Sequence, residues 1–380
     1  MDFALTDDQK MFRDLFRDFA TKEVAKVAKH IDEAEEPPID LLKKAAAQGF
    51  LAATIPEELG GAALDPMSYA LLIEETAKVC ASTAITLALH NSLSVMPLIL
   101  FGTADQKQRW APKFVESIGA FALTEPDSGT DANHLSTRAR KDGDHYIVNG
   151  VKTWVSNAGI ASTLVFFAES DKQPVAFIVD VKTPGIKIGH REPTLGLRGV
   201  SINTVYFDQV IVPTADRLGT EGEGLHIAHL ALAHMRLAIA ALALGAAEGA
   251  LALGRAFAIE RRQFGVSIAA KQAIGNYFAD TEIEIEALRH MVEYTAWLVD
   301  QKKDYVQAAL KTKTLGGKVA RDAANRMLQV HGGYGFSDEY VISRIYRDVR
   351  ALDIMGGTPQ IGRVLIARDM FAEAGVKIKP

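Results

Sequence analysis

The sequence predicts a mainly α protein with a β-rich middle part. Apolar residues recur at helical spacing in the first and last parts of the chain, and short β-type runs lie between them. Because each type comes in runs and the two types do not alternate, a doubly wound parallel sheet is not expected. The two changes of pattern divide the chain into a helical domain 1–119, a strand domain 120–222 and a helical domain 223–380.

The first domain begins with a helix signal. Thr6 and Gln9 have the spacing of a capping box, and the apolar residues over 12–19 then follow a helical period. The Glu-Glu-Pro-Pro stretch at 35–38 is expected to end this helix. A second helix is predicted from Leu41, and 67–100 carry long apolar helical periods.

The middle domain contains short runs typical of strands, separated by Gly, Pro, Asn and Asp as in hairpins and barrels. These runs are Tyr146–Val148, Thr163–Phe167, Val175–Val181 and Val205–Val212.

Five helices are predicted in the last domain, at about 224–263, 274–302, 306–331, 337–354 and 359–373. The stretch 224–258 is the most apolar, but Arg236, Glu248 and Arg255 interrupt it. A spanning helix needs about 20 mainly apolar residues with few or no charges. The twelve alanines from Ala231 to Ala258 instead indicate a helix packed closely on others, so we expect no membrane span.

Composition excludes several classes of function. A net charge of −5 without a basic tract gives no reason to expect a nucleic-acid partner. Cys80 is the single cysteine, which rules out an internal disulfide and suits a reducing compartment; with no secretory signal at the N-terminus, we expect a cytoplasmic protein. No dinucleotide, P-loop, zinc or serine-hydrolase motif is present, and no metal site is predicted.

Four segments are candidates for chemistry. The turn-rich segment 122–131 offers backbone N–H groups and hydroxyls to a polar ring edge or a phosphate. In segment 150–158, Trp154 and Ser156 are two residues apart on a predicted strand, so both fall on one face, where one could stack on a ring and the other bond its heteroatom.

The other two segments suit phosphates. Segment 260–265 with Gln272 supplies arginines, which are forked donors for a pyrophosphate. The run 329–360 contains paired glycines that let a backbone approach a ligand, and Thr358 opens a helix whose N-terminus suits an anion.

Taken together, ALTEPDSGTDA, GVKTWVSNA, ERRQFG with a later Gln, QVHGGYG and GGTPQIGR resemble the acyl-CoA dehydrogenase family, in the family's order and spacing, from about residue 3 to 373. This resemblance implies an α-helical N-terminal domain, a middle β-barrel and a C-terminal four-helix bundle. It also implies FAD lying between subunits of a homotetramer, an acyl-CoA substrate and an electron-transfer flavoprotein as electron acceptor.

The resemblance also implies roles for individual residues. Phe121, Leu123 and Thr124 would contact the flavin ring on one side, and Trp154 and Ser156 on the other. The remaining cofactor positions are Arg261, Gln263, Phe264, Gln272, Gln329, Gly332, Gly333, Thr358 and Gln360, and the substrate positions are Thr130, Arg236, Met355 and Gly356.

The carboxylate that the family uses as its base is absent from both expected positions. Most relatives carry a glutamate immediately before Gly-Thr, where this chain has Gly356, and a minority carry it before a helix arginine, where this chain has Met235. The backbone N–H of Gly356 could still bind a thioester carbonyl, and the vacated volume would admit a bulkier acyl group. An acidic CoA contact of the family is replaced by Ala233. His90 is the remaining candidate base, with a structural role as the competing interpretation.

The leading hypothesis is therefore an FAD-dependent α,β-dehydrogenation of an acyl-CoA with a relocated or non-standard base. An elimination such as desulfination is the alternative, since relatives that remove a β-sulfinate share the Gly-Gly-Thr sequence; the lack of Arg and Lys over 81–100 counts against it. A non-catalytic flavin- or CoA-binding homologue is the third hypothesis.

Overall fold

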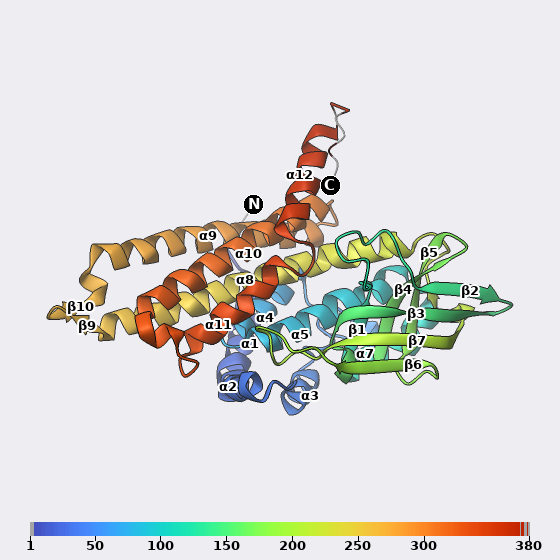
Figure 1. The fold of residues 1–380 in the computed structure, drawn as a ribbon, viewed down its shortest axis with the longest axis horizontal. Coiled ribbons are helices and arrows are strands. Elements are labelled where there is room, and N and C mark those ends of the chain that lie inside the picture. Colours follow the sequence, from blue (N-terminus) through green and yellow to red (C-terminus); the bar gives the residue numbers. More distant parts are fainter. Residues whose placement is uncertain (1–3, 373, 376–377, 379–380) are drawn as a thin grey trace.

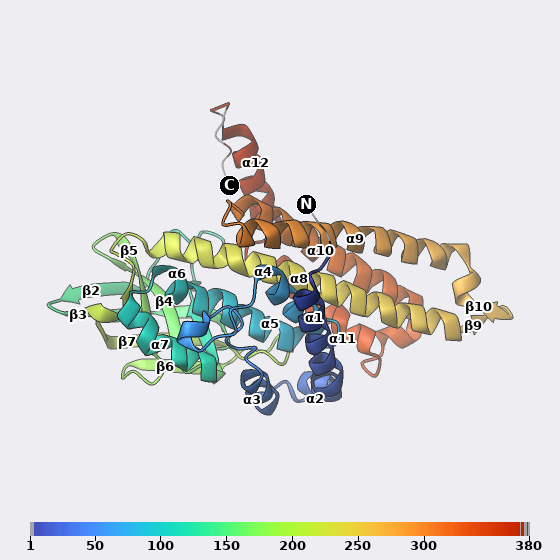
Figure 2. The same ribbon diagram turned by 180° about the vertical axis from the view of Figure 1, so that it is seen from behind.

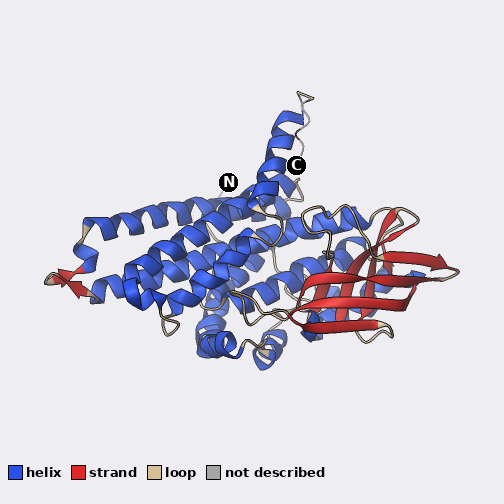
Figure 3. Ribbon diagram, in the orientation of Figure 1, coloured by secondary structure: helices blue, strands red, loops and turns tan. Residues whose placement is uncertain are grey.

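The computed structural model describes residues 4–372, 374–375 and 378, and its chain order is helices, strands, then long helices (Figures 1 and 3). The predicted start is confirmed: the Thr6 side chain and the Gln9 side chain each bond the other's backbone in a capping box. The first helical run ends at Ala34, where Glu35 adopts a left-handed conformation before two prolines. The N-terminal helices are α1 Asp7–Phe19, α2 Ala25–Ala34, α3 Ile39–Ala47, α4 Pro66–Ala77, α5 Ala81–Leu89, α6 Met96–Phe101 and α7 Ala104–Glu116.

The middle part is one sheet in the order β6-β7-β3-β2-β4-β5-β8, with β1 paired in parallel to β4. The end strands β6 and β8 do not pair within the described residues, so hydrogen bonds do not close the expected barrel. Strands β2 and β4 pair in parallel through a single residue pair, Arg138 with Glu169. Its strands are β1 Gly119–Ala122, β2 Arg138–Asp142, β3 His145–Ser156, β4 Thr163–Ser170, β5 Gln173–Asp180, β6 Ile186–Arg191, β7 Ile202–Pro213 and β8 Arg217–Leu218.

Strand β4 is buried on both faces, which explains its continuous apolar run. Leu164 and Phe166 point into a core shared with β3, β5 and β7. Val165 and Phe167 point the other way, into a cluster with Trp110 of α7 and with the start of the long helix that follows the sheet. From behind, α6 and α7 cover this face (Figure 2). Burial on both faces therefore joins the sheet to the helical part of the molecule.

The last part contains α8 Gly224–Glu260, α9 Gln272–Asp300, α10 Val306–His331 and α11 Val341–Val349, packed lengthwise, and α12 Pro359–Ala372, which projects from the body (Figure 1). Glycines let α8 approach its neighbours: a Cβ on Gly245 would strike the backbone of α4. Helix α8 ends at Glu260, earlier than predicted, because the short hairpin β9 Arg262–Gln263 and β10 Val266–Ser267 follows, with a left-handed Phe264 at its turn.

Two helical stretches are long and apolar enough to cross a membrane by length and composition, Ala81–Phe101 and Gly224–Glu260. In their most apolar windows, 83% and 78% of the residues are buried inside the fold. Their apolar surface is thus covered by protein, as it is in a core helix.

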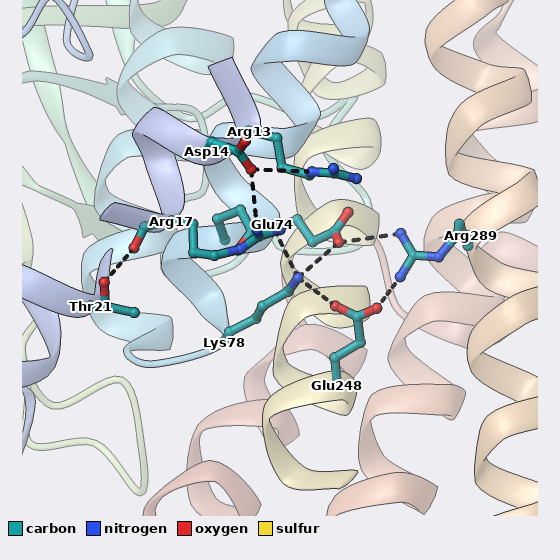
Figure 4. A network of polar contacts seen from close by, with 9 residues as sticks. Arg13, Asp14, Arg17, Thr21, Glu74, Lys78, Glu248 and Arg289 are labelled. Carbon is teal, nitrogen blue, oxygen red and sulfur yellow. Dashed lines mark hydrogen bonds and ion pairs between the residues drawn. The ribbon is translucent and has the colours of Figure 1, made fainter. Parts of the chain in front are cut away.

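A network of charges joins α4 to the bundle (Figure 4). The Lys78 ammonium lies 2.9 Å from Glu75 and 2.8 Å from Glu248, and Arg289 of α9 pairs with both Glu248 and Glu74. Burial raises the pKa of Glu74 to about 7, and the negative charge of Glu248 adds to this while Lys78 and Arg289 oppose it. Both cations reach Glu74 through Oε1, and Oε2 has no hydrogen-bond partner among the described residues.

We expect Glu74→Gln to flatten the pH dependence of stability. The pKa of Glu74 in the folded protein lies above its ordinary value of 4.5, so its contribution is fully present below pH 4.5 and is lost as pH rises through about 7. In urea unfolding at pH 5 and pH 8, wild type should lose up to about 3 kcal/mol more than the variant. Glu58→Gln, at an exposed position, is the control; equal pH slopes in all three proteins would contradict the expectation.

Candidate functional site

The first two predicted segments lie side by side at one end of the sheet. The chain leaves β1 at Ala122, and the Thr153 N–H of β3 donates to the Thr124 carbonyl over 2.9 Å. Thr124 and Trp154 share a cavity of about 270 Å³, lined also by Glu125, Pro126, Gly129, Thr153, Glu192 and Thr204. Phe121 packs on Phe167, and Leu123 is buried. The structure thus brings together Thr124 and Trp154, which the sequence separates by thirty residues.

A β-bulge decides which side chains of β3 face the cavity. The pairing of β3 with β7 shifts register between Lys152 and Val155, and Trp154 has a left-handed φ of 56°. As a result Lys152 is fully buried while Trp154 is 61% exposed, although strict alternation would put both on one face. Ser156 is half-buried beyond the bulge. An exposed indole beside a threonine suits the face of a planar heteroaromatic ring.

A buried ion pair holds this segment from behind. Lys152 Nζ lies 2.7 Å from Glu125 Oε1 and donates to the Leu123 carbonyl over 3.0 Å. The Glu125 carboxylate also accepts from the backbone N–H groups of Ser136 and Thr137. These bonds tie the loop that carries Leu123 and Thr124 to strand β3 and to the segment at Ser136 and Thr137.

The pKa values agree with an ionised pair at neutral pH. Burial raises the pKa of Glu125, but the charge of Lys152 and the hydrogen bonds more than offset burial, so this pKa lies below its usual value. Burial lowers the pKa of Lys152 to about 8, with Glu125 opposing the shift. Sequence reasoning missed this pair; the signal was a lysine at an inward position of a strand.

The third and fourth segments form a second cavity, of about 950 Å³, where α8, β9 and α10 end. Arg261, Gln263, Phe264, Gly332 and Gly333 all line it. The Arg261 guanidinium lies over the Tyr334 ring at 5.4 Å, and a Cβ on either glycine would meet open space. A guanidinium beside open backbone suits a diphosphate. Gln272 and Gln329 are exposed and do not line this cavity.

The two cavities lie apart in one molecule. The first belongs to β1 and β3, and the second lies beside β9 and β10 at the far end of the bundle (Figure 1). Thr358, whose hydroxyl accepts from the Ile361 N–H, and the exposed Gln360 lie at the start of α12, apart from both cavities. Within one chain, the predicted cofactor residues therefore lie at the first cavity, around the second cavity and at the start of α12.

The turn before α12 carries the predicted substrate residues Met355 and Gly356, and Arg236 of α8 reaches it. Arg236 Nε donates to the Gly356 carbonyl over 3.1 Å, and Lys313 Nζ of α10 donates to the Gly357 carbonyl over 2.5 Å. Thr130 is exposed on the loop of the first cavity, and no contact joins it to this turn within the described residues. Lys313 was not predicted.

The expectation of a vacated volume at Gly356 is wrong. A Cβ built on Gly356 would lie 2.6 Å from Met235 Cε and 3.2 Å from Ile239 Cδ1. The Met235 side chain, which is itself buried, fills that space. Gly356 also has a φ of 70°, a conformation that favours glycine.

The geometry of His90 favours a structural role. Its Nε2 lies 2.8 Å from the Leu51 carbonyl, and its Nδ1 accepts from the Gly119 N–H over 2.9 Å. Burial lowers the pKa of His90 to about 4, although its backbone hydrogen bonds oppose this. A neutral ring with both nitrogens bonded to backbone has no free position for a substrate proton.

We expect Lys152→Met to lower the free energy of unfolding by about 3–5 kcal/mol, because it leaves the Glu125 charge buried without its partner. FAD affinity should fall with it, since the loop that carries Thr124 loses its anchor. Urea unfolding and release of flavin fluorescence measure the two effects. Glu125→Gln with Lys152→Met should recover part of the stability, and Lys187→Met, at an exposed position of β6, is the control. A Lys152→Met protein as stable as that control would refute the role of the pair.

Three family models match the chain along almost its whole length. They describe the acyl-CoA dehydrogenase N-terminal domain at 6–117, middle domain at 120–210 and C-terminal domain at 222–371. The exact domain boundaries given above stay a prediction. A curated relative, the short-chain specific acyl-CoA dehydrogenase of Clostridium acetobutylicum, is 37% identical over 98% of this chain and 100% of its own length.

Solved structures agree with this match. One described as the electron transferring flavoprotein of Acidaminococcus fermentans superposes with a TM-score of 0.96, at 39% identity over 97% of this chain and 99% of that one. An acyl-CoA dehydrogenase of Bacillus anthracis complexed with FAD superposes with a TM-score of 0.93, at 30% identity over 98% of this chain and 68% of that one. The two cavities fit the ring and the diphosphate of that cofactor, so FAD is the cofactor indicated here. The chain belongs to the acyl-CoA dehydrogenase family, as an FAD-dependent enzyme.

Proposed function

We propose that this protein oxidises an acyl-CoA thioester by α,β-dehydrogenation, without a carboxylate at either position that relatives use for the base. The observation that carries the proposal is the preformed ring site, in which Thr124 and Trp154 line one cavity and the buried Lys152–Glu125 pair fixes their loop. The identity with a short-chain specific relative over its full length supports an acyl-CoA substrate.

Each group of this chain then has a definite task. FAD, when bound, supplies the acceptor for the hydride that leaves the β-carbon. Trp154, Thr124 and Ser156 would hold its ring. The Gly356 N–H would bind the thioester carbonyl and stabilise the negative charge that grows on its oxygen as the α-proton leaves. Arg236 and Lys313 hold this turn in place through the carbonyls of Gly356 and Gly357.

Proton removal is the step that departs from the family pattern. The three atoms nearest to where a Cβ on Gly356 would lie belong to Met235, Ile239 and Lys313, and none of these side chains is a carboxylate. His90 is closed off by its two backbone bonds. We therefore expect slow proton abstraction from ordinary saturated acyl-CoAs, since a positioned general base contributes about 10²–10⁴-fold in rate.

A second copy of the chain would complete the cofactor site. The ring cavity beside β1 and β3 and the diphosphate cavity beside β9 and β10 lie apart in one molecule, so Arg261 of one copy would serve the cavity that Trp154 of another copy lines (Figure 1). We propose a homotetramer with FAD between subunits. An electron-transfer flavoprotein is proposed as the electron acceptor, in line with the description of one similar structure.

Loss of a β-substituent, as in desulfination, is the second candidate function. It is favoured by the same observation that slows dehydrogenation: a β-sulfinate leaves as sulfur dioxide, which water converts to sulfite, its bonding electrons stay on the β-carbon, and that carbon takes a proton, so no α-proton is removed. A flavin-binding protein without catalysis remains the third, and the preformed ring site counts against it.

The test of the proposal is flavin bleaching. The purified holoprotein, mixed without oxygen with straight, branched and cyclic saturated acyl-CoAs, should lose its yellow absorbance with at least one of them. Photochemical reduction of the same sample is the control for a competent flavin. Perturbation of the flavin spectrum without bleaching by any of them would refute dehydrogenation, and release of sulfite from a β-sulfinyl acyl-CoA would then separate desulfination from binding without catalysis.

Met235→Glu should accelerate bleaching by about 100-fold or more relative to Met235→Gln. The carboxylate would sit on α8 in an ordinary helical conformation, with its side chain beside the Gly356 turn. Gly356→Glu should fail in the same assay, because its φ of 70° and the contact with Met235 Cε both oppose a side chain there. Equal rates for the two Met235 variants would show that a missing carboxylate is not what limits this protein.

A further inference from the structure

His90 joins the N-terminal helices to strand β1, which leads into the ring site. It opens a π-helical segment, His90–Val95, inside the continuous helix 81–101, and such segments often lie at functional sites. The Gly119 N–H at the start of β1 donates to His90 Nδ1 over 2.9 Å. Since Nδ1 accepts, the ring proton lies on Nε2, which donates to the Leu51 carbonyl over 2.8 Å. One side chain thus bonds both the loop after α3 and the first residue of β1.

The contact between β1 and the π-helical segment is tightly packed. A Cβ on Gly119 would overlap the Phe114 ring and lie 2.7 Å from Ser94 Cβ, so the strand comes this close only at a glycine. His90 is fully buried there, with its ring 5.7 Å from the Phe114 ring in an edge-to-face contact. Because water is excluded, the Gly119 N–H would be left unsatisfied without the imidazole, which is costly for a buried donor.

His90 accepts this hydrogen bond because its ring is neutral. Burial lowers the pKa of His90 to about 4, and hydrogen bonds with the backbone of Leu51 and Phe114 oppose this shift. The ring therefore carries no charge at pH 7, and its Nδ1 lone pair is available to Gly119.

Strand β1 is held at both ends by buried side chains, besides its pairing with β4. His90 bonds its first residue, and the Leu123 carbonyl just after its last residue accepts from Lys152 Nζ over 3.0 Å. Thr124, which lines the ring cavity, follows directly. The position of Thr124 therefore depends on where both ends of β1 are fixed.

We propose that His90 is a positioning residue for the flavin: by accepting from Gly119 it fixes the start of β1, and through β1 the Leu123–Thr124 edge of the ring site. This rests on the ring site of the proposed function and involves no acyl-CoA chemistry. Without the bond, β1 can shift in the protein that has not yet bound FAD. Affinity then falls with the fraction of protein whose strand is already in place, so the loss appears in the Kd of FAD.

Two substitutions separate the two bonds of His90. Asparagine carries an acceptor at the same number of bonds from Cβ as Nδ1, so His90→Asn keeps the bond to Gly119 and loses that to Leu51. Glutamine carries N–H groups at the distance of Nε2, so His90→Gln keeps the bond to Leu51 and loses that to Gly119. Asn91→Ala is the matched control: Asn91 is the next residue of the same buried segment and donates to the Phe50 carbonyl, and none of its printed bonds reaches β1.

The experiment titrates each apoprotein with FAD and follows flavin fluorescence, in a sucrose buffer that favours the folded state. Visible circular dichroism of the saturated protein reports the surroundings of the ring, and urea unfolding shows that each variant is folded. His90→Gln should weaken FAD binding by about tenfold and change the flavin spectrum, because a buried donor loses its acceptor. His90→Asn and Asn91→Ala should stay within about threefold of wild type with its spectrum, even where they lower the free energy of unfolding.

A His90→Gln protein that binds FAD as Asn91→Ala does would leave His90 a role in general stability only and overturn the proposal. So would a His90→Asn protein as impaired as His90→Gln. If His90→Gln does not fold, His90→Asn decides: normal FAD binding supports the proposal, and weakened binding overturns it. No acyl-CoA takes part in these titrations, so a failure of the bleaching assay rejects the proposed function without touching their result.

Discussion

Helix α8 is the constraint on which the rest of this structure depends. It packs against α4, α5, α9 and α10, and its first turns pack against the sheet through Ile227 and Ala228. Alanines and glycines make this possible, because a backbone can approach closely only where side chains are small. One helix thereby fixes the positions of both ends of the molecule: it carries Arg236 beside the Gly356 turn, and it ends next to Arg261.

Charge compensation distinguishes the parts of the site. Behind the flavin loop, Lys152 and Glu125 are buried together and bond each other, and both also bond backbone groups. At the Gly356 turn, the half-buried Arg236 and the buried Lys313 donate to backbone carbonyls. The first arrangement fixes the loop of the ring site, and the second fixes the turn that carries the predicted substrate residues Met355 and Gly356.

Part of the fold could be read from local patterns, because the forces that set them are local. The capping box at Thr6, the break at Glu35 and the helix over 306–331 all depend on residues within a few positions of one another. The bulge at Trp154 could not be predicted in this way, because it arises from pairing with β7, a strand about fifty residues later. The same holds for the filling of the Gly356 position by Met235, two residues that are 121 positions apart.

The sequence by itself determined the family, the order of helices and strands, and the absence of a carboxylate at positions 235 and 356, since these depend on residue identity and short-range spacing. Tertiary structure alone decided the rest. In the folded chain, His90 bonds two backbone groups and Lys152 pairs with Glu125. Lys313 and Arg236 bond carbonyls of the same turn. The physical reason is the same in each case: burial and charge compensation depend on which distant segments share an interior, and no local pattern records that.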